Sequence, residues 1–78
     1  MPIDANRYRK PRQPLGRWLL DQTARPGLIG DLAKAAKADP RFPVDGDFDR
    51  ISKRLNELRA DPDMHVALED AELDWAAL

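Results

Sequence analysis

The side chains that could carry out chemistry in this chain are few and scattered. His65 is the only histidine and there is no cysteine, so no zinc site of imidazole and thiolate ligands can be assembled. Ser52 and Thr23 stand in no motif that pairs a nucleophile with a base. We therefore expect no catalytic residue, no bound metal and no cofactor, and no small-molecule substrate is evident.

Acidic side chains offer another route to a metal site, and their spacing argues against one. Four acids lie close together in sequence, at Glu69, Asp70, Glu72 and Asp74. On a helix, which turns about 100° per residue, they point in several directions and do not converge on one ion. The segment 45–49 looks like the start of a calcium loop, but it lacks the later bidentate Glu. The acids at 69–74 are interpreted as solvated acidic surface, and the calcium-loop interpretation of 45–49 is given little weight.

Two glycines flank the start of a predicted helix, where free N–H groups can hold a phosphate. Asp31 in that first turn would repel such an anion. We favour structural roles, with Gly27 in a turn after proline and Gly30 at a close packing contact.

The N-terminal segment has the composition of a nucleic-acid contact. Residues 1–17 contain five Lys or Arg and one Asp, together with an aromatic side chain that could stack on a base. The alternative is an ordinary solubilising tail, and the sequence pI of about 5.7 argues against a domain whose whole surface is basic. The candidate nucleic-acid contacts are Arg7, Tyr8, Arg9, Lys10, Arg12 and Arg17.

The C-terminal helix offers a candidate partner surface made of Val66, Leu73, Asp70 and Asp74. Val66 and Leu73 fall opposite the main apolar stripe, so they form either a second internal packing face or an exposed contact patch. Internal packing is the default, because small bundles often bury more than one side of a helix.

The acids of this helix should also have an electrostatic complement. Residues 61–78 contain six Asp or Glu and no Lys or Arg, and acids near a helix C-terminus oppose the helix dipole. Antiparallel packing of the last two helices would make Arg50 the best-placed cation, with Lys53, Arg54 and the N-terminal arm as other sources. The competing hypothesis is that the acids stay unpaired and await a basic partner.

Helical periodicity and proline positions define the elements that must place these side chains. We predict helices over about 14–24, 27–38 and 48–59, and a last one that starts at Asp61-Pro62. Asp47 is the predicted N-cap of the third helix. The apolar stripes predict one core, with Phe42 entering from a loop, composed of Trp18, Leu32, Phe42, Ile51, Leu55, Leu68 and Trp75.

The expected architecture is all-α, a compact bundle of four to five short helices over 14–78, preceded by a flexible basic arm over 1–13. With 78 residues there is room for a single core. The absence of cysteine, of an apolar signal segment and of any stretch of about 20 apolar residues favours a cytoplasmic protein without a membrane contact.

From about Leu15 onward the chain resembles the YozE SAM-like family of small bacterial helical proteins. The matching pieces, in order, are Trp18-Leu19 with Gln22, Arg25, residues 29–33, Asp39-Pro40, Phe42-Pro43, and Ala67-Leu68-Glu69 with Trp75. The resemblance implies a bundle similar to a sterile alpha motif. The family has no assigned biochemical activity, so the resemblance bears on fold much more than on function.

Two function classes follow from these observations. The first is a small non-enzymatic protein-interaction or scaffolding module, whose partner is another protein or a second copy of the chain. The alternative is a nucleic-acid-associated accessory protein that uses the basic N-terminal arm. An enzyme ranks third, because no set of acid, base and nucleophile is visible.

Overall fold

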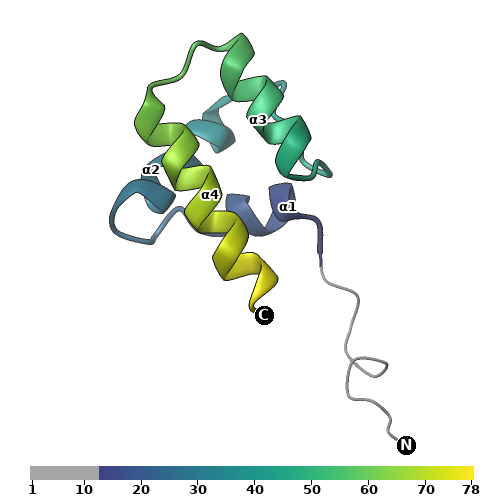
Figure 1. The fold of residues 1–78 in the computed structure, drawn as a ribbon, viewed down its shortest axis with the longest axis vertical. Helices are drawn as coiled ribbons and strands as arrows, with labels where there is room; N and C mark the ends of the chain where they lie inside the picture. Colours follow the sequence, from purple (N-terminus) through teal and green to yellow (C-terminus); the bar gives the residue numbers. More distant parts are fainter. Residues whose placement is uncertain (1–12) are drawn as a thin grey trace, which may run out of the picture.

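The computed structural model describes residues 13–78 and contains four helices (Figure 1). They are α1 (Leu15–Leu20), α2 (Leu28–Ala38), α3 (Phe48–Glu57) and α4 (Pro62–Ala76). No strand occurs in this part of the chain, so the predicted all-α bundle is confirmed. None of the four helices is long and apolar enough to span a membrane. Most of the predicted flexible arm, residues 1–12, lies outside the described residues.

The predicted boundaries hold closely for three helices, whereas α1 ends four residues earlier than expected. After Leu20 the chain tightens into turns, in which Gln22 N–H donates to the Leu19 carbonyl and Arg25 N–H to the Gln22 carbonyl. These bonds span three residues instead of four and lead into the Arg25-Pro26-Gly27 break. The loop 21–27 therefore turns sharply toward α2.

Both ends of α3 are held by hydrogen bonds. The Asp47 side chain accepts from the Arg50 N–H at 3.0 Å, which confirms the predicted N-cap. At the other end, Ala60 N–H donates to the Leu55 carbonyl and Arg59 adopts a left-handed conformation with φ of 53°. By contrast, Asp61 precedes α4 without a side-chain capping bond.

One apolar core lies between the four helices. Figure 1 shows α4 crossing diagonally in front of α2, and these two helices make the most extensive contact in the fold. Small side chains on both, including Ala33 and Ala67, are fully buried and allow this close approach. Phe42 enters the core from the loop, as predicted. Of the seven predicted core residues, only Trp75 is half-buried, and it packs against the edge of the core.

Two glycines permit backbone contacts that no side chain would allow. A Cβ at Gly30 would collide with the Arg25 carbonyl oxygen, which confirms the close-packing role expected for this residue. A Cβ at Gly16 would lie 2.5 Å from the Pro43 carbonyl oxygen, and the Gly16 N–H donates to the Gly46 carbonyl at 3.1 Å. These contacts fix the loops 21–27 and 43–47 against the helices.

Candidate functional site

The residues with catalytic or metal-binding chemistry do not converge. Within residues 13–78 no three His, Asp or Glu side chains are placed to hold a metal ion. His65 is half-buried in the first turn of α4, while Thr23 lies in the loop after α1 and Ser52 in α3. In segment 45–49, Asp45 pairs with Arg17 in an exposed contact and Asp47 caps α3.

The predicted nucleic-acid contacts divide between two parts of the chain. Arg7, Tyr8, Arg9, Lys10 and Arg12 lie outside the described residues, so their role stays a prediction. Arg17 is on α1, and its Nε donates to an Asp45 carboxylate oxygen, with both side chains more than half exposed. This pairing leaves Arg17 less available to a phosphate than the sequence suggested.

The outward side of α4 carries the predicted partner residues, but the default interpretation of its apolar pair was wrong. Val66 and Leu73 are 45% and 69% exposed, so they do not form a second internal face. The reason is that Ala67, Leu68 and Ala71 already fill the side of α4 that meets the core. Spaced seven residues apart, Val66 and Leu73 lie on one side of the helix.

The electrostatic complement of α4 exists, but it is not the predicted cation. Asp74 Oδ2 accepts from Arg25 Nη2 at 2.6 Å, and the Arg25 guanidinium carbon lies 6.0 Å from the centre of the Trp18 ring. Arg25 thus connects α1 and α4 from the loop between α1 and α2. No ion pair within residues 13–78 involves Asp70.

Arg50 was named as this complement on the ground that the start of α3 neighbours the end of α4. The neighbourhood itself is correct, because Asp47, Phe48 and Asp49 line a shallow hollow together with Glu72 and Trp75. The charged residues at the start of α3 that line this hollow are acidic, however. Arg50, one position further along α3, lines a different hollow, and the prediction of its partner was wrong.

That second hollow is lined mainly by basic side chains. It is open, has a volume of about 330 Å³, and lies between α3 and the loop that follows α2. Its lining residues are Arg41, Pro43, Arg50, Lys53, Arg54 and Glu57. No ion pair within residues 13–78 involves Arg41, Arg50 or Lys53.

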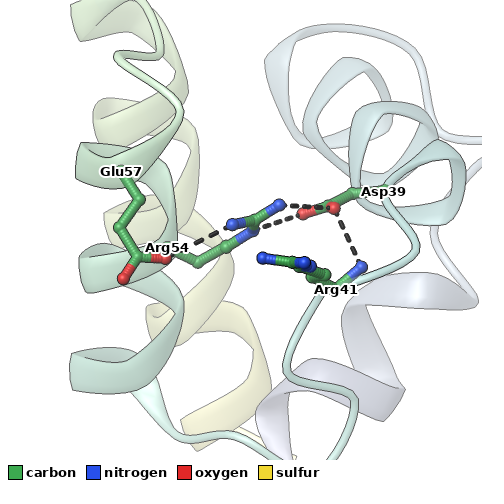
Figure 2. A network of polar contacts seen from close by, with 4 residues as sticks. All are labelled: Asp39, Arg41, Arg54 and Glu57. Atoms are coloured by element: carbon green, nitrogen blue, oxygen red, sulfur yellow. Dashed lines mark hydrogen bonds and ion pairs between the residues drawn. The ribbon is translucent and has the colours of Figure 1, made fainter.

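Arg54 is held in place by an acid behind it, as Figure 2 shows. Its Nε and Nη2 atoms donate to the two carboxylate oxygens of Asp39, each at 2.8 Å, and its Nη1 donates to Glu57 at 3.3 Å. Asp39 also accepts from the backbone N–H of Arg41 at 3.0 Å. One carboxylate therefore positions both the arginine of α3 and the loop that carries Arg41.

The Asp39–Arg54 pair is shielded, with side chains only 9% and 17% exposed. The hydrogen bonds from Arg54, assisted by the bond from the Arg41 N–H, lower the pKa of Asp39 from 3.8 to about 2, although partial burial opposes this shift. The hydrogen bonds between Arg54 and Asp39, together with the bond from Arg54 to Glu57, raise the pKa of Arg54. Asp39 is therefore ionised at any physiological pH.

Sequence reasoning identified the cations of α3 but missed the hollow. The one sequence feature that could have indicated the hollow is the basic outer face of α3 together with Arg41, which lies between two prolines. Bringing the two together requires the Asp39–Arg54 contact across fifteen residues, which no local pattern encodes.

No family model, curated protein or solved structure matches the chain. A proposal about its function therefore depends on the fold and on the surfaces described above. The resemblance to the YozE SAM-like family stays a prediction.

Proposed function

We propose that this chain is a small, cytoplasmic, non-enzymatic protein-interaction module, and that the outward side of α4 is its docking surface. The observation that supports the proposal is the exposure of Val66 and Leu73 on a helix that carries no Lys or Arg. Two large apolar side chains on one side of a helix bury area only when a partner covers them.

Charge indicates the chemistry of that partner. Asp63, Glu69 and Asp70 are exposed and flank the apolar pair, and no Lys or Arg lies between them in α4. A basic amphipathic helix would place apolar side chains against Val66 and Leu73 and its lysines or arginines against the acids. We therefore propose such a helix, from another protein, as the occupant.

The test uses a synthetic helical peptide with leucines at i, i+3, i+4 and i+7 and lysines elsewhere. A second peptide of the same design, with glutamate in place of lysine, is the charge control. We expect the basic peptide alone to shift the backbone NMR signals of α4. Changing Val66 and Leu73 together to Ser should weaken its binding at least about tenfold, because exposed apolar anchors carry most of such an interface.

A matched control changes Leu28 and Val44 to Ser, since these side chains are each 38% exposed on other elements. This double variant should bind the basic peptide as the parent chain does. Equal loss in both double variants, or shifts that avoid α4, would overturn the proposed surface. Concentration-dependent self-association through α4, measured by sedimentation, would replace the partner helix by a second copy of the chain.

A further inference from the structure

The basic hollow beside α3 belongs to a different face of the fold and has no role in the α4 proposal. It brings together cations from two elements, Arg41 from the loop after α2 and Arg50 and Lys53 from α3. These three cations make no ion pair within the described part of the chain, and the one acid that lines the hollow with them, Glu57, accepts from Arg54. Such a cluster repels itself and is stabilised by an anion.

The frame of the hollow is fixed before any anion arrives. Asp39 binds the Arg54 guanidinium through two hydrogen bonds and also holds the Arg41 backbone, as seen in Figure 2. The two walls of the hollow are thereby joined by hydrogen bonds and do not have to be brought together on binding. A preorganised site avoids much of the ordering cost that a ligand would otherwise have to offset.

We propose that this hollow binds the phosphate backbone of nucleic acid. Cations on facing walls of an open hollow suit a chain of phosphates that passes between them, and guanidinium groups donate to phosphate oxygens in a matching geometry. No aromatic side chain lines the hollow, so it offers no platform on which an unpaired base could stack. The contact is therefore to the backbone of a duplex and independent of base sequence.

The size of the effect follows from the number of cations. If Arg41, Arg50 and Lys53 each neutralise one phosphate, the hollow contributes about −2.7 to the slope of log affinity against log salt. Between 50 and 200 mM salt this contribution alone weakens binding by about 40-fold. Any contribution from the N-terminal cations adds to the slope of every variant equally.

The experiment measures binding of the full chain to a labelled 20-base-pair duplex by fluorescence anisotropy over this salt range. Changing Arg50 and Lys53 together to Gln should lower the magnitude of the slope by about 1.8. The matched control changes Lys34 and Lys37 to Gln. These cations are also exposed, also spaced i, i+3 on a helix, and lie outside the hollow.

The control variant removes the same charge and should keep nearly the parental slope. Circular dichroism verifies that both double variants remain helical. The same reduction of slope in both variants would overturn the site, because it would mean that only net charge matters. Failure of the parent chain to bind duplex at 50 mM salt would also overturn it. Tighter binding of polyglutamate than of a duplex of equal charge would assign the hollow to an acidic protein segment instead.

Discussion

Replacing Asp39 by Asn removes one negative charge from the network behind the basic hollow. The Asn side chain retains an oxygen that can accept from the Arg41 N–H, whereas its amide NH2 replaces the oxygen that accepts from Arg54 Nε. The variant therefore removes the charge and one hydrogen bond of the contact with Arg54 and can keep the contact with the loop. The lowering of the Asp39 pKa from 3.8 to about 2 corresponds to at most about 2.5 kcal/mol of stability at neutral pH. Because part of the pair meets water, we expect a loss of about 1 to 2 kcal/mol, or roughly 5 to 15 °C in melting temperature.

The pH dependence gives a sharper test than the loss itself. A carboxyl whose pKa is lowered by folding contributes its full stability above its unfolded pKa of 3.8 and loses it as pH falls through about 2. Urea unfolding of the parent chain and of Asp39→Asn should therefore differ most near pH 6. The difference should shrink between about pH 4 and pH 2.

The matched control is Asp45→Asn, which removes an acid of the same type from a pair with another arginine. Asp45 and Arg17 are 70% and 54% exposed, so water competes with their contact and the control should unfold nearly as the parent chain does. Parallel stability profiles of the parent chain and of Asp39→Asn from pH 7 to pH 2 would refute the argument. An equal loss in both variants would refute the role given to shielding.

Three further substitutions test the packing. Gly30→Ala should destabilise the chain by about 1 to 3 kcal/mol in urea unfolding, because the new methyl group would meet the Arg25 carbonyl and outweigh the gain in helix propensity; a more stable variant would contradict this. Arg59→Gly should leave the free energy of unfolding unchanged or raise it by up to about 1 kcal/mol, because glycine adopts the left-handed conformation without strain. A clearly lower melting temperature would argue against the left-handed residue at the end of α3. Trp75→Ala should lower the free energy of unfolding by about 2 to 3 kcal/mol, less than the loss of a fully buried tryptophan. This loss includes the hydrogen bond from the indole N–H to the Gln13 carbonyl. An unchanged melting temperature would contradict the position of Trp75 at the edge of the core.

The helices and most of the core were predictable because their signals are local. Proline at the start of α4, the Asp47 cap and the 3.6-residue spacing of Ile51 and Leu55 each depend on a few neighbouring residues. Phe42 was placed correctly from its position between two prolines, since a large aromatic side chain in a short loop has only the core in which to bury itself.

The surfaces were less predictable because they depend on how the helices pack. Helical periodicity placed Val66 and Leu73 on one side of α4, but only the packed structure shows that, within residues 13–78, both side chains stay exposed on that side. The partner of Asp74 was wrongly assigned because Arg25 lies in a loop, 49 residues away in sequence, whose course depends on the contact at Gly30. The number of charges in the sequence cannot show which cation pairs with Asp74 unless the path of this loop is known.

The charged side chains of residues 13–78 fall into two groups, those in ion pairs that connect elements and those that make no ion pair within this range. The pairs of Asp39 with Arg54 and of Asp74 with Arg25 each join segments that are distant in sequence. Two of the groups left over carry mainly one sign, the acids on α4 and the cations around the hollow beside α3. Repulsion within each surface opposes folding, so a ligand of opposite charge that binds only the folded chain stabilises it by mass action. Because the surfaces lie on different helices, a basic peptide and a nucleic acid should each raise the melting temperature through its own set of residues. A substitution on one surface therefore leaves the other as an internal control.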